Sequence, residues 1–179
     1  MKLSKIIFIL SSTVLLNASC NGQSENKLQQ TNDIQWMSFE QAVAKSNVTP
    51  KKIFIDISTS WCGWCKKMDA STFKDTSIIR YMNDHYYAVR LDAETHDTIH
   101  FQDKLFVFKP EYKANELALS LLSGQMSYPS FIFMDEKFVL LSPLAGYQTV
   151  PQLEAVMKYF GANIFKDQKW EDYQKSLGN

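Results

Sequence analysis

The heptapeptide WCGWCKK, residues 61–67, carries the strongest structural signal in the chain. It follows KIFIDI, residues 52–57, a nearly continuous run of β-favouring apolar residues interrupted by Asp56. Apolar residues on both faces of a strand predict a central strand that is covered on both sides. We expect a helix to begin within residues 61–67 and to continue to about Ala70. The two cysteines then stand where a buried strand gives way to a helix.

Cys62 and Cys65 are three residues apart, so they can form a disulfide across the first turn of that helix. Helix N-terminal amides carry a partial positive charge, which stabilises a thiolate and lowers the pKa of the first thiol. We expect the Cys62 sulfur to be exposed and Cys65, inside the turn, to be more sheltered. The pattern therefore predicts Cys62 as the attacking thiol and Cys65 as the resolving thiol.

Two other interpretations of the cysteine pair stay open: a structural disulfide, and half of a zinc site. A tetrahedral zinc site needs a second pair of ligands. His96 and His100 are four residues apart, but they lie in a segment with the pattern of a loop and hairpin. The chain has three cysteines and hence no second pair, so we predict no metal.

Composition is that of a folded chain with no strong charge. Of 179 residues, 45% are hydrophobic and 21% are charged, which is typical of a globular domain. Lysine and arginine total 19, as do aspartate and glutamate, so the formal net charge is zero. Nucleic-acid binding needs a clustered basic excess, so it is not predicted. The length favours one domain.

The remaining patterns predict a mixed α/β sandwich, because strands alternate with helices and a late hairpin adds an antiparallel edge. Capping residues or helical periodicity predict helices at about 38–49, 76–85, 115–123, 149–160 and 168–177. Strands are expected at 86–91, 130–134 and 138–141, and a small hairpin around 101–108.

The first twenty residues have the pattern of an export signal. Lys2 and Lys5 precede an 11-residue apolar run, Ile6–Leu16, which is too short to span a bilayer as a stable helix. The sequence Ala18-Ser19-Cys20 that follows resembles the lipobox of bacterial lipoproteins, although Asn17 departs from the usual aliphatic residue. That resemblance implies a signal peptide at 1–19 and a lipid on Cys20. An ordinary signal-peptidase site with an incidental cysteine is the alternative.

Residues 21–33, NGQSENKLQQTND, contain one strongly apolar residue and no period, so we expect a flexible tether. The segment 20–33 would thus comprise the lipidated cysteine and its tether, and residues 34–179 the folded domain. Without residues 1–19 the chain has 17 basic and 19 acidic residues, a net charge of −2. A basic surface would then contribute little to membrane binding, and the acyl chains on Cys20 would supply the attachment.

The chain resembles thioredoxin-like thiol–disulfide oxidoreductases, in particular secreted or lipid-anchored bacterial members with a WCGWC motif. Asp56 stands six residues before Cys62, as the buried acid of thioredoxin does. Tyr128-Pro129-Ser130 matches the family's cis-proline site, and Gly146 matches a glycine before the terminal helix. The resemblance covers about residues 34–160. It implies a thioredoxin-like fold, with a central mixed β-sheet flanked by helices.

Two departures limit what the resemblance carries over. The dipeptide between the cysteines is Gly63-Trp64 instead of Gly-Pro, so the family's redox potential does not transfer. Residues 94–126 are longer than the matching stretch of plain thioredoxin and predict an insertion before the cis-proline strand. We expect this insertion to act in partner specificity, and residues 168–177 to form an extra C-terminal helix.

The other candidate site residues have physical roles of their own. A carboxylate buried in an apolar strand has a raised pKa, so Asp56 is a candidate to accept the proton of Cys65. Pro129, if its peptide bond is cis, shapes the backbone facing Cys62, where Tyr128 would pair with an extended substrate. Trp61 and Trp64 are predicted as an exposed apolar rim for substrate binding, with core packing of Trp61 as the alternative.

Taken with the resemblance, these residues predict a reductase of protein disulfides in the cell envelope that needs no soluble cofactor. Its partners would be envelope proteins with disulfides and a membrane or protein thiol donor. The chain would be exported and lipid-anchored, facing the periplasm. An oxidase or isomerase of the same fold is one alternative, and a client-binding or metallochaperone module is another.

Overall fold

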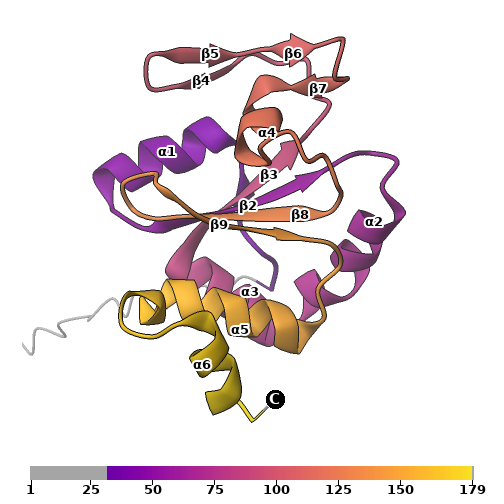
Figure 1. The fold of residues 1–179 in the computed structure, drawn as a ribbon. Coiled ribbons are helices and arrows are strands. Elements are labelled where there is room, and N and C mark those ends of the chain that lie inside the picture. Colours follow the sequence, from indigo (N-terminus) through magenta and orange to yellow (C-terminus); the bar gives the residue numbers. More distant parts are fainter. Residues whose placement is uncertain (1–31, 179) are drawn as a thin grey trace, which may run out of the picture.

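Five strands form the central sheet, in the order β1-β3-β2-β8-β9 (Figure 1). They are β1 (Trp36–Met37), β2 (Lys52–Ser58), β3 (Tyr86–Asp92), β8 (Ser130–Met134) and β9 (Leu140–Ala145). β1 and β2 run parallel to β3, whereas β8 is antiparallel to β2 and β9 is antiparallel to β8. The structure, a computed structural model, describes residues 32–178. The mixed α/β sandwich expected from the sequence is confirmed.

Helices cover both faces of this sheet. They are α1 (Phe39–Val48), α2 (Gly63–Ala70), α3 (Thr76–His85), α4 (Glu116–Leu121), α5 (Val150–Gly161) and α6 (Trp170–Ser176). Two short 3-10 turns, η1 (Thr72–Lys74) and η2 (Ile164–Lys166), follow α2 and α5. Figure 1 shows α1 and α4 on one side of the sheet and α3, α5 and α6 on the other. Capping boxes begin α1 and α5, as their sequences predict.

The alternation of side chains along β2 divides the core in two. Phe54 belongs to the cluster under α2, α3 and α5, together with Phe131 and Phe133 of β8. Ile53, Ile55 and Ile57 belong to the cluster on the opposite face, under α1 and α4. Residues 52–57 are all buried, so β2 is the central strand that its sequence predicts.

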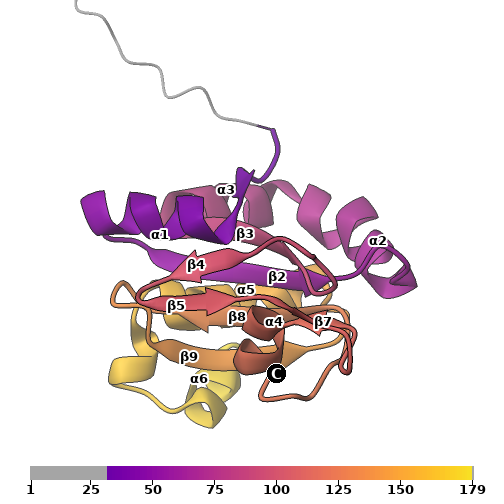
Figure 2. The same cartoon turned by 90° about the horizontal axis from the view of Figure 1, so that it is seen from above.

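Residues 94–126 fold back over the α1 face of the sheet (Figure 2). They form two small hairpins, of β4 (Ile99–Phe101) with β5 (Lys104–Phe106) and of β6 (Phe108–Lys109) with β7 (Ala114–Asn115), followed by α4. Their buried apolar side chains join the cluster that contains Ile53, Ile55 and Ile57. The segment is thus part of the core on this face.

The structure corrects three details of the sequence prediction. The last strand is Leu140–Ala145 instead of 138–141, because Phe138, with φ 65°, lies in the turn. That strand continues through Pro143, which an edge strand tolerates. β1 and the β6–β7 hairpin were not expected, since two-residue strands leave no periodic pattern.

Candidate active site

The cysteine pair lies where the end of β2 leads into α2. Cys62 is the N-cap of α2, and its Sγ accepts a hydrogen bond of 3.1 Å from the backbone N–H of Cys65. Its own N–H donates to the carbonyl of Thr59 at 3.2 Å. Cys62 and Cys65 are joined by a disulfide. The first sulfur therefore sits on the amides that favour a thiolate.

The expected difference in exposure between the two cysteines is wrong. Cys62 is 4% exposed and Cys65 is 7% exposed, so both are buried in the disulfide form. The Cys62 sulfur is bonded to Cys65 within the first turn of α2, and the neighbouring Trp61 packs against Tyr128. Exposure thus does not distinguish the attacking thiol from the resolving thiol. The two sulfurs differ in that the Cys62 Sγ accepts the hydrogen bond from the Cys65 amide.

Asp56 is 3% exposed and lies on the same face of β2 as Phe54, which packs beneath α2. On α2, Cys65 and Met68 are the buried positions, three residues apart and so on its inner side. Burial raises the pKa of Asp56 to about 7, with the Arg90 guanidinium opposing and the Asp69 carboxylate adding to the rise. Its Oδ1 is buried and accepts no hydrogen bond from the described residues.

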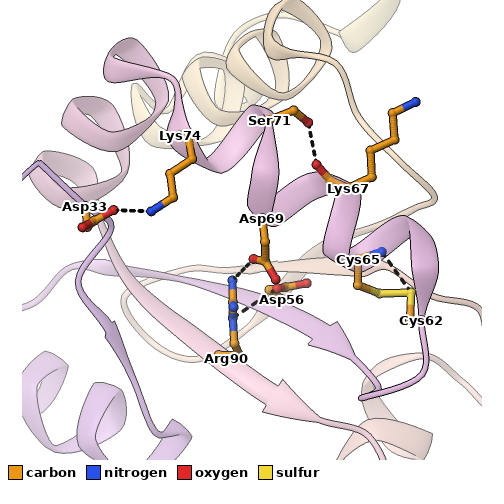
Figure 3. Close-up of polar contacts among 9 residues, drawn as sticks. All are labelled: Asp33, Asp56, Cys62, Cys65, Lys67, Asp69, Ser71, Lys74 and Arg90. Atoms are coloured by element: carbon orange, nitrogen blue, oxygen red, sulfur yellow. Dashed lines mark hydrogen bonds and ion pairs between the residues drawn. A yellow bond between two sulfur atoms is a disulfide. The ribbon is translucent and has the colours of Figure 1, made fainter.

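Arg90 links this buried carboxylate to the surface (Figure 3). Its Nε lies 3.5 Å from Oδ2 of Asp56, and its Nη2 lies 2.5 Å from Oδ1 of Asp69 on α2. The guanidinium also stacks on Trp36, at 4.3 Å from the ring centroid. The register explains the first contact, because Asp56 and Arg90 are direct partners in the β2–β3 pair. Arg90 was not predicted as a site residue, although it is the one charged residue within the run YYAVRL, residues 86–91.

On one side of the disulfide, Trp61 packs against Tyr128. Their rings meet edge to face with centroids 5.8 Å apart. The Trp61 indole N–H donates to both carboxylate oxygens of Glu94, at 3.1 Å each. The peptide bond between Tyr128 and Pro129 is cis. Trp61 remains 62% exposed, so it lies on the rim and not in the core.

On the other side, Trp64 packs against Tyr147, which follows β9. The ring centroids are 5.6 Å apart, and Trp64 is 56% exposed. The Lys67 ammonium lies 4.8 Å from the Trp64 ring and 4.9 Å from the Tyr147 ring. Neither Tyr147 nor Glu94 was predicted, because sequence distance hides which loops reach the cysteines.

Two further predictions concern the membrane and metals. Cys20 and residues 1–19 lie outside the described residues, as does most of the segment 20–33. Within residues 32–178, no helix is long and apolar enough to cross a membrane. In the same part of the chain, no three His, Cys, Asp or Glu side chains group in a way that could hold a metal ion.

A disulfide at the junction of β2 and α2, a buried acid and a cis-proline turn lie at one end of the sheet. The sequence model of the Thioredox_DsbH family, described as a protein of unknown function, DUF255, matches residues 19–145. The chain belongs to this family. The predicted thioredoxin-like family is therefore confirmed, and Cys62 and Cys65 form a disulfide in this chain.

Solved structures agree with the predicted thioredoxin fold. A structure described as DsbH oxidoreductase covers 78% of this chain and 92% of its own, with a TM-score of 0.51 and 20% identity. A putative disulphide-isomerase from Bacteroides thetaiotaomicron covers 72% of this chain and 94% of its own, with a TM-score of 0.52 and 25% identity. The chain thus has the thioredoxin fold.

Sequence relatives match a shorter stretch. The thiol:disulfide interchange protein DsbD of Pseudoalteromonas atlantica is 32% identical over 100 residues, which is 52% of this chain and 17% of that protein. The chain spans between 9% and 17% of the length of the curated relatives it matches.

Proposed function

We propose that the chain catalyses thiol–disulfide exchange as a reductase of protein disulfides in the cell envelope. The observation that carries the proposal is the position of Cys62. Its sulfur is the side-chain cap of α2 and accepts the Cys65 amide hydrogen bond, an arrangement that stabilises the thiolate of the reduced form.

The reaction has two displacements. The Cys62 thiolate attacks one sulfur of the substrate disulfide, a Cys62–substrate disulfide forms, and the other substrate sulfur leaves as a thiolate. The Cys65 thiol then loses its proton and attacks Cys62, which releases the second substrate thiol. The substrate gains two electrons, and Cys62 and Cys65 end as a disulfide. A membrane or protein thiol donor returns the pair to the dithiol.

Asp56 is proposed as the base for the second displacement. A carboxylate with a pKa of about 7 is divided between its two forms near neutral pH, so it can take a proton and release it again. Its Oδ1 is the oxygen that holds no hydrogen bond from the described residues, so it is available to the Cys65 thiol. The Arg90 guanidinium, which stays protonated, pairs with both Asp56 and the more exposed Asp69 and so holds the Asp56 carboxylate in place.

Trp61, Trp64 and Tyr128 are proposed to bind the substrate. The two tryptophans flank the cysteine pair and are each more than half exposed. The backbone of Tyr128, next to the cis peptide of Pro129, would pair with an extended substrate segment. Aromatic side chains of this kind supply much of the contact energy of protein interfaces.

Single-turnover kinetics test the reaction and the two thiol roles. The reduced protein should reduce a protein disulfide, and Cys62→Ser should abolish the reaction because the nucleophile is gone. Cys65→Ser should instead accumulate a mixed disulfide on Cys62, detected by mass spectrometry. A mixed disulfide that forms on Cys65 of the Cys62→Ser variant at the unmodified chain's rate would reverse the assignment. In a redox titration, a potential nearer about −270 mV than about −120 mV is expected of a reductase, and the opposite result would favour an oxidase.

The proposed location is the periplasmic side of a membrane, with a lipid on Cys20. The support is the sequence alone: a basic start, a short apolar run and Ala18-Ser19-Cys20. Mass spectrometry of the mature protein should find Cys20 at the N-terminus and acylated, and Cys20→Ala should release the protein from the membrane. A free thiol on Cys20 would contradict the anchor.

A further inference from the structure

We propose that the surface around Cys62 carries negative charge at one edge and positive charge at the other. This rim would select an extended substrate segment with basic residues on one side of the reacting cysteine and acidic residues on the other. The acidic edge of the rim is Asp92 and Glu94, and the basic edge is Lys67. This inference rests on the proposed exchange at Cys62 and adds the chemistry of the segment that docks there.

The acidic edge is held in place by the residues of the rim itself. Glu94 accepts the indole hydrogen bond of Trp61, and its backbone N–H donates to the Asp92 carboxylate at 3.0 Å. Burial raises the pKa of Tyr128, and the Glu94 and Asp92 carboxylates raise it further, so both acids face this ring. Asp92 is exposed and Glu94 is partly exposed. Their charges are therefore directed at the solvent beside the cysteines.

The basic edge is held by aromatic rings. The Lys67 ammonium lies within 5 Å of the ring centroids of both Trp64 and Tyr147, while Tyr147 shares a hydrogen bond of 3.2 Å with Ser71. Cation–π contacts with two rings restrict where the ammonium can lie. These contacts favour a position of the Lys67 ammonium beside Trp64 and Tyr147.

The strand order places the two edges on opposite sides of the disulfide. Asp92 ends β3, the Cys62 loop follows β2, Pro129 precedes β8, and Tyr147 follows β9. These points all lie at one end of the sheet, since Gly146 N–H bonds to the Pro129 carbonyl at 2.8 Å and Ala93 N–H bonds to the Ser58 carbonyl at 2.8 Å. Neighbouring strands are about 4.8 Å apart, so the path from β3 to β9 is about 14 Å. An extended peptide covers that path with about four residues.

The probe is a set of short peptides with one central cysteine, activated as a 2-pyridyl disulfide. In one peptide, lysines occupy the second and third positions before the cysteine and glutamates the same positions after it; another has the reverse order, and a third has glutamine at all four. The Cys62 thiolate of the reduced full-length protein attacks the peptide sulfur, the bond to the pyridine sulfur breaks, and thiopyridone leaves with the electron pair. Its absorbance gives the rate. Cys65 then displaces the peptide thiol.

At low salt, the two charged peptides should differ in rate by about fivefold, with the neutral peptide between them, because pairs of exposed charges are weak individually. The difference should shrink at about 1 M salt, where the Debye length is about 3 Å. In the double variant Glu94→Lys with Lys67→Glu, the preferred order should invert. Because each ratio is taken within one variant, a change of overall rate caused by moving Trp61 cancels.

The control is Lys137→Glu, which makes the same charge change as Lys67→Glu but in the exposed β8–β9 turn, at the far end of β8 from Pro129. It should keep the ratio of the unmodified chain. Equal rates for the two charged peptides, or an unchanged preference in the double variant, would overturn the polar rim while leaving the exchange reaction intact. No reaction with any of the three peptides, the neutral one included, would overturn the proposed function itself.

Discussion

Burial and the Arg90 guanidinium have opposite effects on the pKa of the Asp56 carboxyl group. Its 3% exposure disfavours the ionised form, and the Arg90 guanidinium at 3.5 Å favours it. Burial dominates, which raises the pKa to about 7 from its ordinary value of 3.8. The folded protein therefore holds a proton at pH 5 that the unfolded chain has already released. Asp56 costs stability at neutral pH.

The raised pKa of Asp56 makes the free energy of unfolding depend on pH. Between about pH 4 and pH 7 the unfolded chain binds fewer protons at this residue than the folded protein does, so stability falls as pH rises, by up to about 4 kcal/mol. Asp56→Asn should remove this slope and be more stable than the unmodified chain at pH 8. Urea unfolding of both oxidised proteins at pH 5 and pH 8 measures it. Parallel pH dependence in the two proteins would show that Asp56 ionises normally.

Arg90 and Asp69 should shift the titration of Asp56 in opposite directions. Arg90→Gln removes the positive charge that lowers the pKa of Asp56, so that pKa should rise further. Asp69→Asn removes a negative charge that raises it, so the pKa should fall. Carbon NMR of the Asp56 carboxyl against pH measures both. If the two variants move the midpoint the same way, the side chains act by holding Asp56 in place and not by charge.

At the scale of elements, Asn115 anchors the insertion to the sheet. It is fully buried and caps α4, with Oδ1 accepting the Leu117 N–H at 3.0 Å. Its Nδ2 donates to the carbonyls of Thr95 and Asp97, and its own N–H donates to Ala93. One side chain thus joins the start of the insertion, beside Glu94, to the helix at its end.

Asn115→Asp separates these two tasks. The carboxylate keeps the helix cap but presents oxygens to two buried carbonyls that need a donor. Leaving such groups unpaired costs about 1–3 kcal/mol each, so the free energy of unfolding should fall by at least about 2 kcal/mol at neutral pH. Asn115→Ser, which keeps a capping oxygen with a neutral donor, is the matched control and should lose less. An Asn115→Asp variant as stable as the unmodified chain would mean that the Nδ2 bonds contribute nothing to stability.

At the scale of the whole molecule, residues 94–126 contribute buried side chains to the hydrophobic core, in addition to their proposed role in partner specificity. Ile99, Phe106, Leu117 and Leu121 are all less than 9% exposed and pack with Ile53 and Ile55 of β2. Burial of a large apolar side chain contributes about 1.5–3 kcal/mol. Four such residues approach the whole stability of a typical domain, about 5–15 kcal/mol.

We therefore expect that replacing residues 94–126 with a short loop abolishes cooperative folding. Thermal melting by circular dichroism should show no sharp transition, and a dye for exposed apolar surface should bind at room temperature. Leu105→Ser, at a side chain that is 55% exposed on β5, is the control and should melt like the unmodified chain. A truncated chain that melts cooperatively would show that α1 and β2 can close this face without the insertion.

The sequence by itself determined the local architecture around the cysteines. An unbroken apolar run predicts β2 as a central strand, the capping residues predict where α1, α3, α4 and α5 begin, and the spacing of Cys62 and Cys65 allows one disulfide in a helical turn. These features depend on a residue and its near neighbours in the chain, so they can be predicted from the sequence alone. The fold class followed from them, and it agrees with the structure.

Only the tertiary structure decided what surrounds the pair. Arg90 reaches Asp56 through the β2–β3 register, and Glu94 reaches Trp61 because β3 ends beside the Cys62 loop. Tyr147 reaches Trp64 because β9 returns to the same end of the sheet. Each of these contacts joins residues far apart in the chain, and many pairings of strands are compatible with one apolar pattern.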